Sequence, residues 1–144
     1  MPTDFAPVSA PSDTAPLFAG AALLDAEKLD CYRLALEFQA VAAGLLPKRG
    51  ASSLRDQLDR ASASIALNIA EGAGRFSPAD KARFYGIARG SATECAAIVD
   101  VILSRGLAPA STCRRGRAML VRIVQMLTRL AAQMASRHWS RSEP

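Results

Sequence analysis

Four segments of this sequence carry apolar side chains at helical spacing, and this periodicity limits the possible folds more than any other feature. Alanine and leucine, which favour helices, are abundant, and no long stretch alternates between apolar and polar residues as a half-buried strand does. Turn residues separate the segments, which span about residues 25–46, 52–72, 77–105 and 111–137. The third segment stops at Arg105 and Gly106, with Pro109 just beyond. We therefore predict an all-α fold, an antiparallel up-down-up-down four-helix bundle.

Each segment has one predicted buried stripe. The stripes of the first two segments are Leu29, Tyr32, Leu36, Gln39, Ala43 and Leu46, and then Leu54, Leu58, Ala61, Ile65 and Ile69. Those of the last two are Phe84, Ala88, Ser91, Cys95, Ile98 and Ile102, and then Met119, Ile123, Met126, Leu127, Leu130 and Met134. The third segment has the strongest start signal, because Ser77 suits the N-cap, Pro78 the first helical position and Asp80 the first turn.

The length and composition indicate a single domain with an N-terminal extension. A chain of 144 residues is typical of one domain. Residues 1–24 hold half of the eight prolines. We therefore predict a Pro-rich flexible arm over residues 1–24, the bundle over 25–137 and a C-terminal tail over 138–144. No run approaches the ~18 apolar residues of a membrane helix and no basic leader precedes an apolar stretch, so we expect a soluble, cytoplasmic protein.

The three cysteines, Cys31, Cys95 and Cys113, lie far apart, and no paired Cys/His spacing accompanies them. A disulfide framework or a metal site is therefore not expected, and an odd number of cysteines suits a reducing compartment. His138 is the only histidine, and we interpret it as a partly exposed residue near a helix end. No motif indicates a cofactor.

The stretch NIAEGAGR, from Asn68 to Arg75, allows two interpretations. Glycines before a helix N-terminus can cradle a phosphate, but a phosphate loop follows a strand and has more glycine, whereas a helix precedes this stretch. The other interpretation is a helix corner, in which Gly72 or Gly74 takes the left-handed conformation that ends one helix before Ser77 begins the next. We favour the corner.

Polar residues near this corner recur at helical spacing. Ser64, Asn68, Glu71 and Arg75 share one face, and Gly86, Gly90 and Glu94 share another. Glycines let another backbone approach closely, so we expect a structural polar network of Asn68, Glu71, Arg75, Arg89, Ser91 and Glu94. Contact with a ligand and catalysis are the alternative roles for these residues. Since neither Cys nor His accompanies them, no nucleophile–base pair is evident, and we do not expect an enzyme.

Four motifs in the middle of the chain resemble a known family. They are DQLxRAxxSI at Asp56–Ile65, NIAEGxGR at Asn68–Arg75, the single Phe84, and IARGSAxE at Ile87–Glu94. Together they resemble the four-helix-bundle proteins encoded in bacterial 23S rRNA intervening sequences. The likeness covers about residues 25–137, although the arginine-rich fourth segment matches only in pattern.

This resemblance implies a small bundle that assembles into a homopentameric ring, and it supplies no catalytic residues. Most members of the family have no established biochemical activity. A related branch, the accessory variability determinant of diversity-generating retroelements, resembles this fold and uses a positively charged pentamer surface to bind nucleic acid and a reverse transcriptase. The resemblance therefore implies RNA, DNA or a reverse transcriptase as partners.

The formal net charge of +5 is concentrated near the C-terminus. Residues 1–103 carry ten basic and twelve acidic residues, whereas residues 104–144 carry eight arginines and one acidic residue. Arg115, Arg122 and Arg129 are seven residues apart, which aligns them within ~20° per step at ~10.5 Å intervals along a helix. The predicted nucleic-acid-binding residues are Arg114, Arg115, Arg117, Arg122, Arg129 and Arg137.

Two other roles are open for these arginines: salt bridges between subunits to Asp56, Asp59 or Glu37, and a merely solubilising helix face. Trp139 is the only aromatic residue nearby, so nucleic-acid binding would be sequence-tolerant and salt-dependent. The sequence thus favours a non-catalytic oligomeric protein that binds the backbone of RNA or DNA. The alternative is an interaction scaffold that docks an acidic protein partner.

Overall fold

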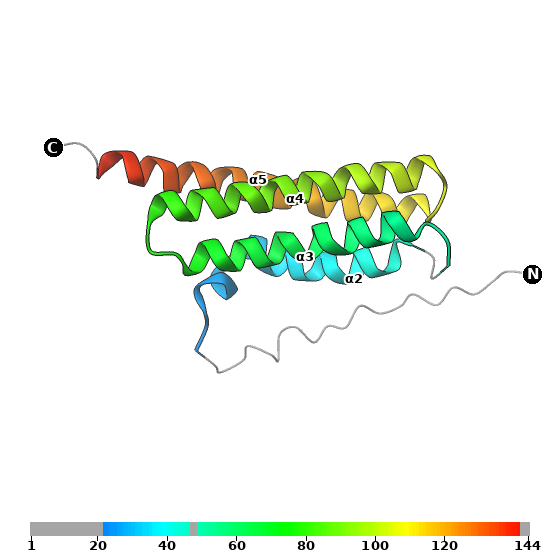
Figure 1. The fold of residues 1–144 in the computed structure, drawn as a ribbon, viewed down its shortest axis with the longest axis horizontal. Helices are drawn as coiled ribbons and strands as arrows, with labels where there is room; N and C mark the ends of the chain where they lie inside the picture. The colour runs from blue at the N-terminus through cyan, green and yellow to red at the C-terminus, as the bar shows by residue number, and fades with distance from the viewer. Residues whose placement is uncertain (1–21, 47–48, 142–144) are drawn as a thin grey trace, which may run out of the picture.

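The computed structural model describes residues 22–46 and 49–141, which form four long helices after one short 3₁₀ helix (Figure 1). Within those ranges there is no β-strand, so the predicted all-α fold with four helices is confirmed. No helix in them is long and apolar enough to cross a bilayer. The elements are η1 (Asp25–Lys28), α2 (Asp30–Gly44), α3 (Ser52–Gly74), α4 (Pro78–Ser104) and α5 (Ala110–Ser140).

The predicted arm and tail lie largely at the ends of the described chain. Residues 1–21 of the arm lie outside it, and residues 22–24 are exposed and precede the first helical turn. The predicted tail begins at residue 138, but α5 continues to Ser140, and only residues 142–144 lie outside the description.

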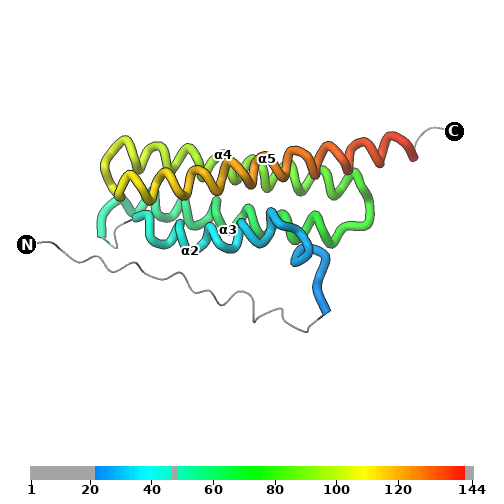
Figure 2. The backbone as a smooth tube through the Cα atoms, turned by 180° about the vertical axis from the view of Figure 1, so that it is seen from behind, coloured from blue at the N-terminus to red at the C-terminus, as the bar shows by residue number. Residues whose placement is uncertain are grey.

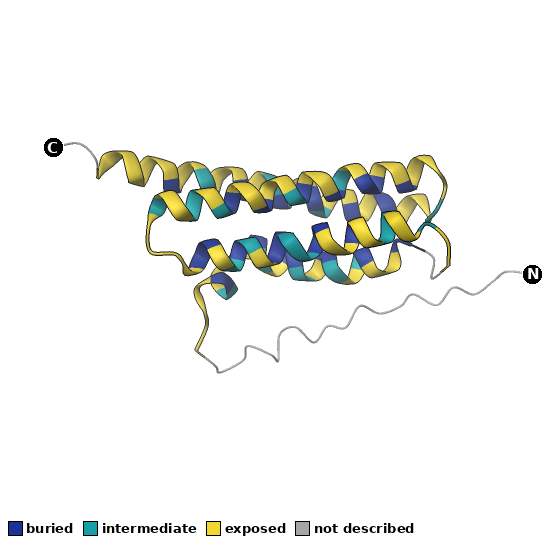
Figure 3. Cartoon of the chain, viewed as in Figure 1, coloured by how far each residue is buried: buried dark blue, intermediate teal, exposed yellow. Residues whose placement is uncertain are grey.

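The four helices pack as neighbouring pairs: α2 with α3, α3 with α4, α4 with α5, and α2 with α5. The connector between α3 and α4 lies at one end of the bundle and the connector between α4 and α5 at the other, as both ribbon and tube show (Figures 1 and 2). Buried positions face the space between the helices, and exposed positions face outward (Figure 3).

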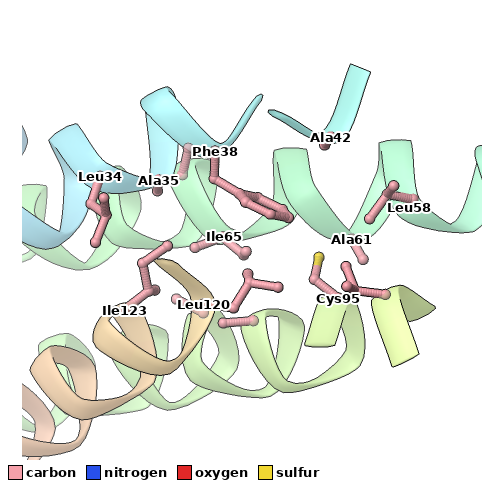
Figure 4. Close-up of a cluster of buried hydrophobic side chains, with 14 of the residues drawn as sticks. Leu34, Ala35, Phe38, Ala42, Leu58, Ala61, Ile65, Cys95, Leu120 and Ile123 are labelled. Atoms are coloured by element: carbon pink, nitrogen blue, oxygen red, sulfur yellow. The ribbon is translucent and has the colours of Figure 1, made fainter. Parts of the chain in front are cut away.

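Every long helix contributes to one continuous apolar core. In the close-up, Phe38 of α2, Ile65 of α3, Cys95 of α4 and Leu120 of α5 gather in the same layer (Figure 4). Each is less than 2 % exposed. Burial of such side chains stabilises the fold by about 1.5–3 kcal/mol each, so this core is the main force that holds α5 in place.

Both ends of α4 follow the predicted local signals. Ser77 is the N-cap, and its hydroxyl accepts a hydrogen bond from the Asp80 amide at 3.4 Å, with Pro78 as the first helical residue. After the helix, Gly106 adopts a φ of +63°, and the Leu107 amide donates to the Ile102 carbonyl at 3.0 Å. Gly106 therefore gives α4 the left-handed ending that glycine permits.

The predicted buried stripe of the first helix is wrong by a rotation. The residues of α2 that are buried are Cys31, Leu34, Ala35, Phe38 and Ala42, whereas Ala43, which the predicted stripe includes, is exposed. Leu29 has extended backbone angles (φ −92°, ψ 126°) between η1 and α2 and is not part of the helix. The predicted positions within α2 are Tyr32, Leu36, Gln39 and Ala43, and each lies one residue, or about 100°, past a buried residue, so the core is on the adjacent side of the helix.

The predicted corner between α3 and α4 is present, but its glycines do not have the predicted role. Neither Gly72 nor Gly74 has a positive φ; both are part of α3, and extended Arg75 ends the helix. Gly72 is instead buried against the next helix. A Cβ there would lie 2.9 Å from Cε1 of Tyr85 and 3.0 Å from Cβ of Phe84. Gly72 thus permits the close approach of α3 to α4.

Candidate nucleic-acid interface

The amphipathic helix α5 presents one apolar side to the bundle and one polar side to solvent. Its buried residues are Cys113, Gly116, Leu120, Ile123, Leu127 and Met134. At Gly116 the helix lies close to α2, since a Cβ there would be 3.3 Å from Cγ1 of Val41. This packing fixes the rotation of α5 about its axis and therefore decides which residues face outward.

Arg115, Arg122 and Arg129 are exposed on the solvent side of α5, as their heptad spacing predicts. Within the described residues, none of the three side chains makes a hydrogen bond, an ion pair or a ring contact. The sequence of α5 contains no Asp or Glu. Their positive charges are therefore not offset by any carboxylate on their own helix.

The remaining predicted arginines differ in their surroundings. Arg114 and Arg137 are exposed, and neither forms an ion pair with a described residue. Arg117 is different, because its Nε donates to Oδ1 of Asp100 on α4 at 3.0 Å. Both side chains are about half exposed, so this pair stabilises the fold by no more than about 1 kcal/mol. Arg117 is thus the predicted site residue with the least free charge.

The proposed acidic partners of these arginines are exposed on other helices. Glu37 is on α2, and Asp56 and Asp59 are on α3. None of them forms an ion pair with an arginine of α5 within the described chain. Any salt bridge between these groups would therefore have to join separate copies of the protein.

The predicted polar network is only partly brought together. The Asn68 side-chain amide donates to the Ser64 carbonyl at 2.9 Å and to the Ser64 hydroxyl at 3.0 Å. The Ser64 hydroxyl in turn lies 2.9 Å from the Ser91 hydroxyl on α4. This chain of bonds links α3 to α4, and Ser64, which shares the Asn68 face, is its central member.

The other members of the predicted network make separate contacts. Arg75 forms an ion pair with Glu71 one turn earlier, and its guanidinium lies 4.9 Å from the centre of the Phe84 ring. Arg89 instead donates to the Thr128 hydroxyl on α5 at 2.8 Å. Glu94 is exposed, so it is not the buried carboxylate that the glycine stripe suggests.

Glu94 borders an open pocket of about 240 Å³ between α3 and α4. The pocket lining is Gln57, Arg60, Ala61, Ser64, Ser91 and Glu94. The lining holds one acidic side chain, one basic side chain and two serines, and no histidine or cysteine. The Ser64 hydroxyl is hydrogen-bonded to Asn68 and Ser91, so no contact among the described residues activates it as a nucleophile.

Two hydrogen bonds between helices have no counterpart in the sequence predictions. Gln39 on α2 donates to the Ser62 carbonyl on α3 at 2.8 Å, and Lys81 on α4 donates to the Ala73 carbonyl at 2.7 Å. The predicted stripe of the first helix includes Gln39, which indicates that its side chain faces inward. The spacing does not identify the Ser62 carbonyl as its hydrogen-bond acceptor. The sequence indicates the role of Lys81 only by its position, one turn after the corner, from which its ammonium group can reach the last carbonyl groups of α3.

The three cysteines are buried and do not form a reactive centre. Burial raises the pKa of the Cys31 thiol to about 11 and that of Cys95 to about 12. Both thiols therefore carry their protons at neutral pH and are poor nucleophiles. Among the described residues, no group of three or more His, Cys, Asp or Glu side chains is placed to hold a metal ion.

Comparison with known proteins connects this fold and its central motifs to a family. Residues 27–129 match the family model described as 23S rRNA-intervening sequence protein. No curated protein matches the chain. The match ends inside α5 at the last arginine of the heptad row, so the C-terminal turns of that helix lie outside it.

Proposed function

The chain belongs to the 23S rRNA-intervening sequence protein family, and we propose that it is a non-catalytic, oligomeric nucleic-acid-binding protein of the cytoplasm. Its subunit is an antiparallel up-down-up-down bundle, and the subunits form a homopentameric ring. The ligand is the phosphate backbone of RNA or DNA, which contacts the outward side of α5. The binding is tolerant of sequence because arginine–phosphate contacts carry no base information.

The observation that carries this proposal is the row of Arg115, Arg122 and Arg129. The three side chains are exposed, unpaired within the described chain, and mounted on a helix without acidic residues. Their helical spacing of ~10.5 Å forms a straight basic line rather than a point. A line of positive charge suits a polyanion, and repetition in every subunit would extend it.

A second surface supports the oligomer. Gly86, Gly90 and Ala97 form a stripe of small residues on the outer side of α4, and a Cβ at either glycine would meet no atom within 4 Å. Each glycine costs a helix about 1 kcal/mol relative to alanine, and none of the residues that the structure describes fills the space beside it. Leu67 on the adjacent α3 is 68 % exposed, and Ile87 is also exposed. A helix of a second copy is the occupant that fits this face.

Electrophoretic and anisotropy titrations at two salt concentrations test the nucleic-acid proposal. The variant R115E/R122E/R129E should bind a structured RNA at least tenfold more weakly than the native protein. The slope of log K against the logarithm of the salt concentration should also become shallower, by about one unit for each phosphate contact that is lost. The matched control is K28E/R33E/R49E, whose sites are exposed outside α5. Both variants lower the formal net charge of +5 by six units, and the control also removes the exposed ion pairs of Lys28 with Asp25 and of Arg33 with Asp30. Such exposed pairs contribute no more than about 1 kcal/mol each, and circular dichroism checks that both variants are folded before their binding is compared.

The result that refutes the proposal is binding that is absent from the native protein, or equally weak in both variants. A scaffold for an acidic protein partner makes the opposite prediction. In that case the purified protein binds no nucleic acid at either salt concentration, and the partner is recovered after nuclease treatment.

A further inference from the structure

The pocket between α3 and α4 is lined almost entirely by polar side chains. Its lining residues are Gln57, Arg60, Ala61, Ser64, Ser91 and Glu94, and its volume is about 240 Å³. All six belong to two of the motifs described above, DQLxRAxxSI on α3 and IARGSAxE on α4. Only Ala61 is buried in the core, so core packing does not explain the other five. What these polar motif residues share is the open space that they surround.

Arg60 and Glu94 bring opposite charges to this pocket without neutralising each other. Arg60 is on α3 and Glu94 on α4, and they do not form an ion pair. The Arg60 Nε donates to the Asp56 carbonyl one turn earlier at 3.4 Å, and the two terminal nitrogens of its guanidinium have no partner among the described residues. The Glu94 carboxylate accepts no hydrogen bond from those residues either. Both charged groups are therefore available to a third group that enters the pocket.

The two serines of the pocket supply a further hydrogen-bond donor. The Ser64 and Ser91 hydroxyls lie 2.9 Å apart and share one hydrogen bond, and the Ser64 hydroxyl also accepts one from the Asn68 amide at 3.0 Å. Two hydroxyls carry two hydrogens, and the bond between them uses one. Whichever serine donates, the other hydrogen has no acceptor among the described residues. One O–H group therefore remains for an oxygen atom of a ligand.

The composition of the pocket selects a ligand by charge and by size. A simple anion would be attracted by Arg60 and repelled by Glu94, and the reverse holds for a simple cation. A molecule that carries both a carboxylate and an ammonium group satisfies the two side chains together. The volume of about 240 Å³ is below the ~300 Å³ at which pockets for drug-sized ligands begin, so the ligand must be small. No aromatic or large aliphatic side chain lines the pocket, so an apolar ligand gains little there.

We propose that this pocket binds a small zwitterion of the amino-acid class, with its carboxylate on Arg60 and a serine hydroxyl and its ammonium group on Glu94. Hydrogen bonds to ionised groups are roughly twice as strong as neutral ones, so these contacts supply most of the affinity. All the lining residues belong to one subunit, so the site does not require a second copy. The arginines of α5 take no part in it, and this proposal and the proposed function therefore stand or fall separately.

Saturation-transfer NMR with small probes tests the charge requirement. Glycine, β-alanine and 4-aminobutyrate are zwitterions whose charges lie progressively further apart, whereas acetate and methylamine carry one charge each. At least one of the zwitterions should bind the native protein with a Kd of about 1 mM or below, and both single-charge probes should bind at least about tenfold more weakly. The proposal is overturned if no zwitterion binds more tightly than acetate and methylamine.

Variants that remove one charge show whether the zwitterion occupies this pocket. Glu94→Gln and Arg60→Gln should each weaken its binding at least about tenfold. The preferences for single-charge probes should change in opposite directions. The Glu94→Gln protein should bind acetate more tightly than the native protein does, and the Arg60→Gln protein should bind methylamine more tightly. A change that only loosened the fold would weaken all the probes alike.

Glu37→Gln and Arg49→Gln are the matched controls. Both sites are exposed, as the two charged pocket residues are, and both lie outside the pocket. The controls should bind every probe as the native protein does, and equal losses of affinity in controls and pocket variants would overturn the proposal. It is also overturned if the pocket variants, but not the controls, lower the mass in light scattering, because the two charges then join copies of the protein.

Discussion

Replacement of Gly72 by alanine should destabilise the protein, although alanine normally stabilises a helix. The added Cβ would lie 2.9 Å from Cε1 of Tyr85 and 3.0 Å from Cβ of Phe84. The Tyr85 ring is buried in the core, and the Phe84 Cβ is attached directly to the backbone of α4. Neither atom can withdraw unless α3 and α4 move apart, so the two helices should separate by a few tenths of an ångström along their shared contact.

The expected size follows from two opposing effects. Overpacking of a well-packed core costs about 1–3 kcal/mol, and the change from glycine to alanine within a helix returns up to about 1 kcal/mol. With the full gain, the net loss is between about 0 and 2 kcal/mol in the free energy of unfolding, and a Cβ contact of only 2.9 Å places it in the upper half of that range, about 1–2 kcal/mol. For a domain of this size, that loss lowers the melting temperature by about 2–8 °C.

Urea unfolding followed by circular dichroism measures this difference, with Gly74→Ala as the control. Gly74 is in the same corner and has a negative φ, and a Cβ there would meet no atom within 4 Å. The control should therefore unfold at the native midpoint or slightly above it. If Gly72→Ala is as stable as Gly74→Ala, the close approach of α3 to α4 does not explain the glycine.

Two further predictions concern the buried thiols and the outer face of α4. Burial raises the thiol pKa from 9.0 to about 11 at Cys31 and about 12 at Cys95, so the unfolded chain loses these protons first. The free energy of unfolding should therefore stay constant up to about pH 9 and decline from there towards pH 12. In the double variant Cys31→Ala/Cys95→Ala the decline should be less steep. Unfolding curves measured at alkaline pH test this, and equal slopes for the two proteins would contradict it. Gly90→Leu places a large side chain on the small-residue face of α4, so light scattering should give the mass of the 15.2 kDa subunit. The helical circular-dichroism spectrum should be unchanged. An unchanged mass would show that Gly90 does not lie in the contact between copies.

Local signals in the sequence predicted the fold well where neighbouring residues alone decide the structure. Ser77, Pro78 and Asp80 start α4 through contacts within one turn, and Gly106 ends it through its own backbone angles. The stripes of α3 and α5 are also correct in their buried centres, such as Ile65 and Ile123. These features need no knowledge of which helix lies opposite.

The features that the sequence did not predict depend on partners far along the chain. Arg89 bonds to Thr128, which is 39 residues later, and Gln39 bonds to a carbonyl 23 residues later. Spacing along one helix cannot name such an acceptor. A glycine near a helix end can either adopt a left-handed conformation or allow another helix to approach closely. The sequence analysis gave Gly72 the first role, and only the position of Tyr85 on α4 shows that it has the second.

The candidate site shows the same division. Heptad spacing correctly placed Arg115, Arg122 and Arg129 on the exposed side of α5, because that side is fixed by the apolar stripe of the same helix. It did not separate Arg117 from them, since the Asp100 that pairs with Arg117 belongs to α4.

The basic row and the small-residue face are physically coupled if both proposals hold. Neighbouring arginines ~10.5 Å apart repel each other weakly within one subunit, because that distance exceeds the screening length of about 8 Å at physiological salt. In the proposed assembly, copies of the row would share one surface without any acidic residue of α5 between them, so repulsion among the arginines would oppose the contact between copies. A polyanion that spans several subunits neutralises that charge only in the assembled state. Nucleic acid and subunit association should therefore strengthen each other, since a ligand that binds the oligomer more tightly than the monomer must shift the equilibrium towards the oligomer.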